Sequence, residues 1–537
     1  NNVTVDPASV NVAIVSINQE IASGVVAVTV DQASRLTGEQ DYVLEDTLTN
    51  LSRAAPITLL SNSEGATVTS SGDAAASIIN YLVDQVPSYV DASALTSLSG
   101  TVAVVAAAFE ETNPDFGPTT LTLAGNIAVT LTNTGSVAAT SLTGVAEQTT
   151  GSVTASSVQT LEGSIANVQA AFDRANLTVA DNVGVALSDS GQVLATSLTG
   201  LSSKTTGDIT SVNVTSITGT ATQAQAALDD SQLVSLSNVA VTISDSGTIL
   251  ASVLTDLANA TTGNVTSAGV TTVTGSAAEV QTALEDPQLV SLGAVAATVS
   301  GTATAVQLNG IIDATTGLIT ASAVTAISGG LASFDALSTA KANGRIVLAS
   351  DVAVSITGTN GNDNIDFSAF TDGSMVVAGL DGADTITGGV GADSLVGGEG
   401  NDVFLVASST ELAADVLVQG DAGTNRIEIT VADVGVADAD FTNVRNIQTL
   451  VLTGASTAVL GATAKDTAGI STVITGDGNT SITLNNSVAM TIDASAMPEG
   501  TTLTLLGDGD ATVSSVNADV DATGLTGTLT ATVVNTA

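Results

Sequence analysis

The tripeptide Thr-Thr-Gly recurs along the chain at almost constant intervals, ending at Gly151, Gly207, Gly263 and Gly317. Successive copies are 56, 56 and 54 residues apart. A second phrase, a glycine followed by Gln six residues later and by Ala eight residues later, keeps the same step from Gly163, Gly219 and Gly275. A unit of this size with two short halves cannot bury a core alone, so neighbouring units must cover one another. The repeat predicts an α/β solenoid.

Each repeat is predicted to contain two strand-turn-helix halves. Alternating apolar runs such as residues 239–243 and 270–273 have the two-residue period of strands. In the second half a helix should begin after Ser276 and stop at Asp286-Pro287. In the first half the turn Asp245-Ser-Gly is followed by helical spacing, which predicts a helix over Ile249, Leu250, Val253, Leu254 and Leu257.

The acidic turns of the first halves admit two interpretations. Asp189 and Asp245 could be metal ligands, because each stands in an exposed-looking Asp-Ser-Gly turn. The same tripeptide is also ordinary turn and helix N-cap chemistry, since a short acidic side chain accepts hydrogen bonds from nearby backbone amides. We favour the turn and N-cap interpretation.

The solenoid occupies only part of the predicted organisation. Copies of the second phrase at Gly100 and, more divergent, at Gly329 extend the array in both directions. We therefore expect four segments, which are an N-terminal cap or divergent repeats at 1–85, the α/β solenoid at 86–345, a calcium-binding β-roll at 346–430 and a C-terminal β-solenoid at 431–537.

Composition narrows the possible functions. The formal charge of −44 disfavours nucleic acid as a partner, and no apolar run is long enough for membrane insertion. The absence of His and Cys excludes the common hydrolytic triads, thiolate chemistry and the Cys/His metal sites. Carboxylate-based catalysis stays open, but no acidic pair stands out, and 2% aromatic residues disfavour a sugar-binding cleft. We expect no enzymatic activity.

From residue 379 the chain adopts a nine-residue period, with units that start at 379, 388 and 397 and carry an Asp at the sixth position. An isolated copy begins at Gly358, and a degenerate copy at Gly420 has Asn425 in place of the Asp. The predicted metal-binding residues are Gly361, Asp363, Gly379, Asp381, Gly382, Asp384, Gly388, Gly389, Gly391, Asp393, Gly397, Gly398, Gly400 and Asp402.

The chemistry of these units points to Ca²⁺. Glycines permit tight loops whose carbonyl oxygens can face a cation, and the Asp adds a hard anionic oxygen. We expect successive loops to stack and to share ions, which would cancel the repulsion among Asp384, Asp393 and Asp402. Many flexible oxygen ligands suit Ca²⁺ better than Mg²⁺. A metal-free ladder of Gly/Asp turns is the alternative that we disfavour.

The units resemble the hemolysin-type calcium-binding repeat of the repeats-in-toxin (RTX) family, GGxGxDxUx. The resemblance implies a parallel β-roll, type I secretion from a Gram-negative cell, and a roll that is disordered at low calcium and folds outside the cell. The segment from Phe441 to Thr453 and the Cys-free, Ala/Thr/Val-rich composition are similar to bacterial surface-layer (S-layer) proteins that carry such repeats.

Two functional hypotheses follow. The first is a secreted structural protein of the Gram-negative cell surface that self-assembles into a surface layer or filament, with copies of itself as partner and cell-surface polysaccharide as a candidate second partner. The second is an adhesin in which the solenoid acts as a stalk. Both hypotheses require an extracellular, calcium-binding protein.

Overall fold

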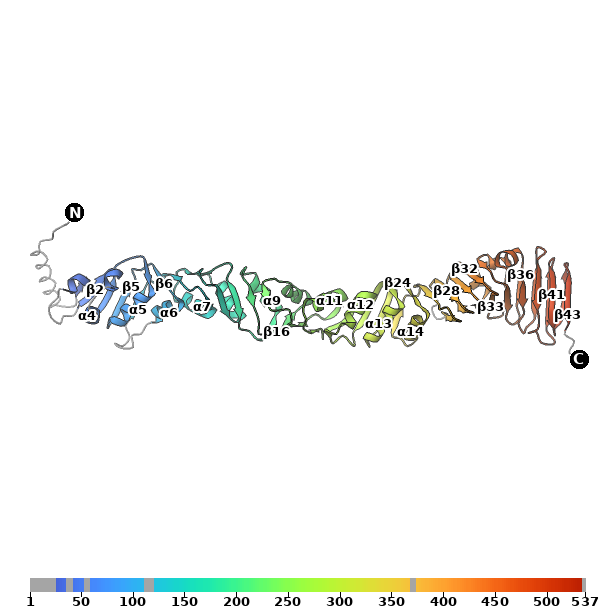
Figure 1. Cartoon of the computed structure of the whole chain (residues 1–537), viewed down its shortest axis with the longest axis horizontal. Helices are drawn as coiled ribbons and strands as arrows, with labels where there is room; N and C mark the ends of the chain where they lie inside the picture. The colour runs from blue at the N-terminus through green and yellow to red at the C-terminus, as the bar shows by residue number, and fades with distance from the viewer. Residues whose placement is uncertain (1–25, 35–41, 53–57, 111–119, 368–372, 534–537) are drawn as a thin grey trace, which may run out of the picture. The chain divides into compact units, whose positions relative to one another are not determined.

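The computed structural model describes residues 26–34, 42–52, 58–110, 120–367 and 373–533. The chain divides into two compact units, one of residues 1–244 with 257–266 and one of residues 245–256 with 267–537. This division falls inside the predicted segment 86–345, and the four-segment organisation remains a prediction. Figure 1 shows short strands alternating with helices, and then strands alone toward the C-terminus.

The helices are short, as expected for a repeat that must turn back within each coil. They are α2 (Val30–Ala33), α3 (Leu48–Ser52), α4 (Thr58–Ser61), α5 (Ala76–Gln85), α6 (Val102–Glu110), α7 (Ala139–Glu147), α8 (Ile165–Asp173), α9 (Ala195–Ser202), α10 (Ala221–Leu228), α11 (Ala251–Ala260), α12 (Ala277–Glu285), α13 (Ala305–Ala314), α14 (Leu331–Ala342) and α15 (Ser409–Ala414), with a 3-10 turn η1 (Asp438–Phe441) and a π-helical turn η2 (Thr463–Ala468).

Strands of the first unit form small sheets in which all pairs are parallel. The four sheets are β1 (Val26–Val28), β2 (Tyr42–Asp46), β3 (Gly65–Val68), β5 (Tyr89–Ala92) and β7 (Thr120–Leu123); β4 (Asp73–Ala75), β6 (Ser97–Gly100), β8 (Ala128–Leu131), β10 (Val153–Ala155) and β12 (Leu177–Val179); β9 (Ser136–Ala138), β11 (Thr160–Gly163), β13 (Gly184–Leu187), β15 (Ile209–Thr210) and β17 (Leu233–Val234); and β14 (Gly191–Leu194), β16 (Val214–Gly219), β18 (Ala240–Ile243) and β20 (Val265–Thr266).

The second unit contains longer parallel sheets. One sheet includes β19 (Gly247–Leu250), β21 (Val270–Ser276), β23 (Ala296–Thr304), β24 (Ile319–Gly330), β25 (Ile346–Leu348), β26 (Ala353–Thr357), β28 (Met375–Asp381), β30 (Ser394–Glu399), β32 (Leu417–Ala422) and β34 (Val444–Arg445), and β22 (Leu289–Val290) lies between β21 and β23 in the chain. The next holds β27 (Asn364–Asp366), β29 (Thr385–Thr387), β31 (Val403–Val406), β33 (Arg426–Ile429), β35 (Thr449–Leu452), β37 (Thr472–Ile474), β39 (Ala489–Asp493), β41 (Asp510–Val516) and β43 (Leu529–Val533). The last holds β36 (Thr457–Leu460), β38 (Thr480–Leu484), β40 (Thr502–Gly507) and β42 (Asp519–Leu525).

The predicted repeat is confirmed by the helix starts. Helices α7, α9 and α11 begin at Ala139, Ala195 and Ala251, which are 56 residues apart, and α8, α10 and α12 keep the same step. Strand pairing is shorter in period, because Leu161 pairs with Val185 and Val185 pairs with Ile209. The predicted fold class, an α/β solenoid followed by a parallel β-roll and further parallel strands, is therefore correct.

The predicted start of the first-half helix is wrong. Ile249 and Leu250 belong to strand β19, where Ile249 pairs with Val273, and the helix α11 begins only at Ala251. Ile249 is 8% exposed and Leu250 is 54% exposed, which is the alternation of a strand. Two apolar residues in succession fit the end of a strand as well as the start of a helix, so spacing alone could not separate them.

Asp189 is part of a turn, as favoured, but it caps a different helix from the one that follows it. Its carboxylate oxygen Oδ2 accepts a hydrogen bond of 2.7 Å from the backbone N–H of Ile165, the first residue of α8. The turn itself joins β13 to β14, and Gly191 adopts a φ of +78° there. The Asp of one coil therefore satisfies the helix N-terminus of the preceding coil.

The conserved spacing of Thr-Thr-Gly has a structural cause in the contact between coils. Thr205 is buried, and its hydroxyl donates to the carbonyl of Val183 at 2.6 Å while it accepts from the N–H of Gly207 at 3.0 Å. A Cβ on Gly207 would meet the carbonyl oxygens of Val183 and Asn182 at 2.5 and 2.6 Å. The first Thr bonds to the adjacent coil, and the Gly permits its close approach. Thr149, Thr261 and Thr315 make the same pair of bonds.

Thr205→Val should therefore weaken the contact between coils. The substitution leaves the carbonyl of Val183 and the N–H of Gly207 without partners, and the local free energy of opening should fall by about 1–3 kcal/mol. Hydrogen exchange of peptides that contain Val183 and Gly207 measures this change. Thr206→Val, at the exposed neighbouring position, is the matched control, and equal effects of the two would contradict the proposed role of the first Thr.

A carboxylate performs the same task in the C-terminal coils. Asp438 accepts hydrogen bonds from the backbone N–H groups of Gly461 at 2.7 Å, Ala464 at 2.8 Å and Thr463 at 3.1 Å. Burial alone would raise its pKa, but these hydrogen bonds outweigh burial and hold the pKa below the usual 3.8. The charged form of Asp438 therefore binds the start of η2 across the coil boundary.

Asp438→Ala should destabilise the C-terminal coils in a pH-dependent way. Because the pKa is lowered by folding, the stabilisation is present above the unfolded pKa of about 4 and is lost as the pH falls through the folded value. At neutral pH we expect a loss of about 1–2 kcal/mol in local stability, vanishing in strong acid. Hydrogen exchange of residues 461–468 across pH measures it, with the exposed Asp466→Ala as control. A difference that does not change with pH would contradict this account.

Candidate metal centre

The nonapeptide segment folds into a roll of two parallel sheets that face each other. Strands β26, β28, β30 and β32 belong to one sheet, and β27, β29, β31 and β33 belong to the other. Ile386 pairs with Phe404 and Val377 pairs with Leu395, and both pairs are 18 residues apart. One coil therefore consists of two nonapeptides, so that consecutive nonapeptides lead into opposite sheets. In Figure 1 these strands follow α14, in the yellow and orange part of the chain.

A first row of side chains follows one edge of the roll, at the start of successive strands of the second sheet. Each backbone N–H in this row donates to the side-chain oxygen of the next coil. The bonds are Asp363 N–H to Asp384 Oδ1 (2.8 Å), Asp384 N–H to Asp402 Oδ1 (3.0 Å), Asp402 N–H to Asn425 Oδ1 (2.8 Å) and Asn425 N–H to Gln448 Oε1 (2.7 Å). We call Asp363, Asp384, Asp402, Asn425 and Gln448 the first row.

A second row lies at the starts of strands of the other sheet. The N–H of Met375 donates to Asp393 Oδ1 at 2.8 Å, and the N–H of Asp393 donates to Asp415 Oδ1 at 3.2 Å. We call Met375, Asp393 and Asp415 the second row. The expectation that Asp384, Asp393 and Asp402 stack together is therefore wrong in part, because Asp393 belongs to a different row. Alternate nonapeptides end at opposite edges, since a coil contains two of them.

The carboxylates of both rows keep one oxygen without a hydrogen-bond partner. The Oδ2 atoms of Asp384, Asp393 and Asp402 are buried and unpaired, and these side chains are 0%, 0% and 1% exposed. A buried carboxylate oxygen without a donor or a cation is strongly unfavourable. Burial raises the pKa of all three side chains, and the charges of Asp402 and Asp363 raise that of Asp384 further. The rows therefore require a positive charge.

The glycines bring backbone oxygens to the same places. A Cβ on Gly379 would collide with both Asp384 Oδ2 and the carbonyl oxygen of Gly397, and a Cβ on Gly358 would meet Gly379 O at 2.5 Å and Asp363 Oδ2 at 2.7 Å. A carboxylate oxygen and a carbonyl oxygen of the next coil thus converge beside each glycine. Such a set of hard oxygen atoms fits Ca²⁺, with the carboxylates as charged ligands and the carbonyls completing the shell.

Backbone oxygens are necessary because the carboxylates are too few in any one place. Across the described ranges of the chain, no three acidic side chains gather closely enough to hold a metal ion by themselves. The predicted ligand Asp381 is exposed and lies opposite Glu399 in the sheet, so it does not join either row.

The other predicted glycines shape the loops. Gly382, Gly389, Gly398 and Gly400 have φ values between +112° and +134°, which other residues rarely adopt. A Cβ on Gly382 would meet the carbonyl oxygen of Gly361 at 2.5 Å, and those on Gly391, Gly398 and Gly400 would collide with the carbonyls of Gly373, Leu380 and Gly382. A Cβ on Gly388 would meet Asp393 Oδ2 at 2.6 Å, and one on Gly397 would collide with Asp402 Oδ2. These contacts explain the glycines by close stacking of the loops.

Sequence reasoning missed Asp415, which the structure places in the second row. Asp415 is 2% exposed, and burial, aided by the charges of Asp393 and Glu411, raises its pKa to about 8. It follows Asp393 by 22 residues and not by 18, because helix α15 replaces a glycine loop. The only signal was an Asp directly before the apolar run 416–418.

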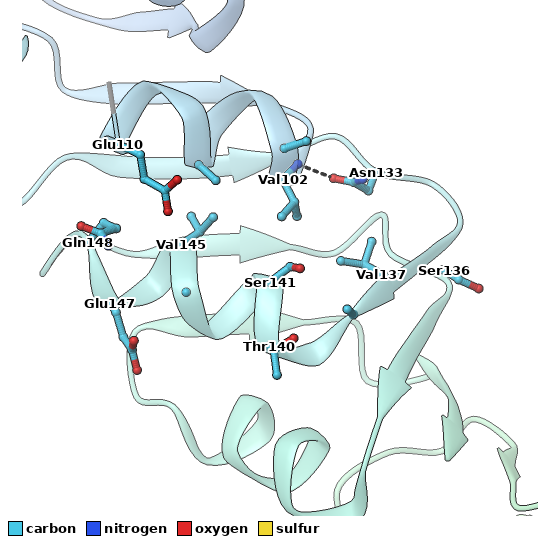
Figure 2. Close-up of a pocket in the computed structure, with 14 residues that line it drawn as sticks. Val102, Glu110, Asn133, Ser136, Val137, Thr140, Ser141, Val145, Glu147 and Gln148 are labelled. Carbon is cyan, nitrogen blue, oxygen red and sulfur yellow. Dashed lines mark hydrogen bonds between the residues drawn. The ribbon is translucent and has the colours of Figure 1, made fainter. Parts of the chain in front are cut away.

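The first unit also has a groove of about 530 Å³ between α6 and α7 (Figure 2). Val102, Val137 and Val145 line it together with Glu110 and Glu147. The side chain of Asn133 accepts a hydrogen bond of 2.8 Å from the N–H of Val102, so its oxygen serves as a helix cap. The lining thus combines apolar packing and capping groups, and the chemistry of the described residues is concentrated in the roll.

Comparison with known proteins agrees with this site. The family described as the RTX calcium-binding nonapeptide repeat matches residues 376–404. No curated protein matches the chain. None of the described helices combines the length and apolar character needed to cross a membrane. The match covers the Asp384, Asp393 and Asp402 turns and identifies the roll as a Ca²⁺-binding structure, of a kind found typically in secreted proteins.

Asp384→Asn tests the ligand assignment. The amide keeps an oxygen for the N–H of Asp363 but removes the charged oxygen, so calcium affinity of the roll should fall by about tenfold or more. Calcium titration followed by circular dichroism measures it. Asp189→Asn, which alters an acidic turn outside the roll, should leave calcium affinity unchanged. If the two variants bind calcium equally well, Asp384 is not a ligand.

Proposed function

We propose that this chain is a secreted structural protein that self-assembles into a surface layer or filament and that requires calcium for its order. The observation that carries the proposal is the pairing of a repetitive, stacked-coil body with buried carboxylates that lack a counter-charge in the roll. A body built of equivalent coils presents equivalent surfaces many times, which suits lateral association of identical copies.

Exposed apolar side chains recur with the repeat and support self-association. Leu194, Leu250 and Val306 are 56 residues apart in sequence and are 55%, 54% and 61% exposed. Large apolar side chains that recur at an exposed position are typical of surfaces that contact another molecule. A second copy of the chain offers the same spacing, so each repeat could make the same contact.

Calcium would act first on folding. Without the ion, Asp384 and Asp402 place unpaired carboxylate oxygens in neighbouring coils, and their repulsion opposes closure of the roll. With the ion, binding free energy becomes folding free energy. A chain with a formal charge of −44 also repels its own copies, and divalent cations reduce this repulsion. The proposal therefore places assembly outside the cell, where calcium is abundant.

The remaining parts of the proposal concern location and partners. We place the protein on the surface of a Gram-negative bacterium after type I secretion, with cell-surface polysaccharide as a candidate anchor. We assign it no catalytic role, because the buried acids of the roll act as ligands and as acceptors for backbone N–H groups. An adhesin is the second candidate, and the uniformly parallel stacking of coils, which suits a stalk, favours it.

Electron microscopy and light scattering of the purified protein test the proposal, in millimolar calcium and in chelator. We expect sheets or filaments in calcium that dissolve in chelator. An Asp384→Asn, Asp402→Asn double variant should fail to assemble at calcium concentrations that suffice for the unaltered chain, whereas Asp466→Asn should assemble normally. Folded, monodisperse particles in calcium would contradict self-assembly and favour the adhesin stalk.

A further inference from the structure

The first row changes chemistry after Asp402. Asn425 occupies the next place, since Phe404 pairs with Ile427 and the N–H of Asp402 donates to Asn425 Oδ1 at 2.8 Å. The Asn425 side chain is 0% exposed, like that of Asp384. Its oxygen thus has the same partner as the Oδ1 atoms of the acidic members, and the difference lies in the second terminal atom of the side chain.

That second atom of Asn425 has a partner where the carboxylates have none. Asn425 Nδ2 donates to the carbonyl oxygen of Asn446 at 3.2 Å. Asn446 follows Arg445, which pairs with Gln419, so it occupies the place of Gly420 in the next coil. Gly420 in turn is equivalent to Gly397, because Gln419 pairs with Val396.

The equivalent pair in the Asp384 turn consists of two acceptors. A Cβ on Gly379 would collide with Asp384 Oδ2 and Gly397 O, and a Cβ on Gly420 would collide with Asn425 Nδ2 and Asn446 O. In the acidic turn, two oxygens converge with no hydrogen between them, whereas in the Asn425 turn an N–H donates directly to the carbonyl. An amide hydrogen bond therefore does what a cation must do one or two coils earlier.

We propose that Asn425 closes the calcium row, so that the first row takes ions up to the Asp402 turn and none beyond it. The inference rests on the proposed ligand role of the first-row carboxylates. The next member extends the change, because the N–H of Asn425 donates to Gln448 Oε1 at 2.7 Å, again a neutral amide. From β33 onward, the coils at this edge close by hydrogen bonds alone.

The test compares the number of bound Ca²⁺ ions per chain after equilibrium dialysis, with each full-length variant in millimolar calcium. Asn425→Asp restores the two-acceptor pair and should bind one ion more than the unaltered chain. Asn264→Asp adds the same charge at an exposed position outside the roll and should not change the count. Asp402→Asn should bind at least one ion fewer. An Asn425→Asp chain that folds but gains no ion overturns the inference.

Thermal unfolding in chelator supplies a second readout that does not depend on Asn425→Asp folding. Asp402→Asn gives its turn an amide hydrogen for the carbonyl of Gly420, so its roll should melt at a higher temperature in chelator than that of the unaltered chain. Asp402→Ala removes the same ligand without supplying the donor and should not gain. Equal melting temperatures of these two variants overturn the inference. If Asp402→Asn and Asp384→Asn leave calcium binding intact, the ligand assignment itself is wrong.

Discussion

The contact that the whole structure depends on is the hydrogen bond from one coil to a polar group of the next coil. In the α/β repeats a buried hydroxyl, such as that of Thr205, bonds to the carbonyl of Val183 one coil earlier. In the roll the backbone N–H of Asp384 bonds to the side chain of Asp402 one coil later. Because each coil is too thin to bury its own polar backbone, these bonds decide whether neighbouring coils can pack.

The chemical nature of that polar group decides whether stacking needs calcium. A threonine hydroxyl donates one bond and accepts another, so Thr205 satisfies both of its neighbours without an ion. An ionised carboxylate only accepts, so Asp384 satisfies one backbone N–H and leaves its second oxygen unpaired in the interior. The same coil architecture is therefore self-sufficient in the α/β repeats and dependent on a cation in the roll.

The sequence predicted most of the fold because its periods are the periods of the coils. The 56-residue step of Thr-Thr-Gly is also the step from the start of α7 to that of α9, and the nonapeptides mark the roll. The start of α11 could not be predicted, since Ile249 and Leu250 satisfy strand and helix spacing equally. The second row was missed for a different reason: helix α15 places Asp415 outside the nine-residue step, and only strand pairing shows that it follows Asp393.

Charge limits how far a calcium-dependent stack can extend. Each additional carboxylate in a row adds a buried negative charge that repels its neighbours, as the raised pKa of Asp384 beside Asp402 and Asp363 indicates. A row therefore needs either an ion for each added carboxylate or a neutral residue at its end. Asn425 and Gln448 keep the oxygen that receives the backbone N–H and carry no charge, so the coil geometry continues while the electrostatic requirement stops. The chain can thus join a segment whose order follows calcium to coils whose order does not, without any change in the way the coils stack.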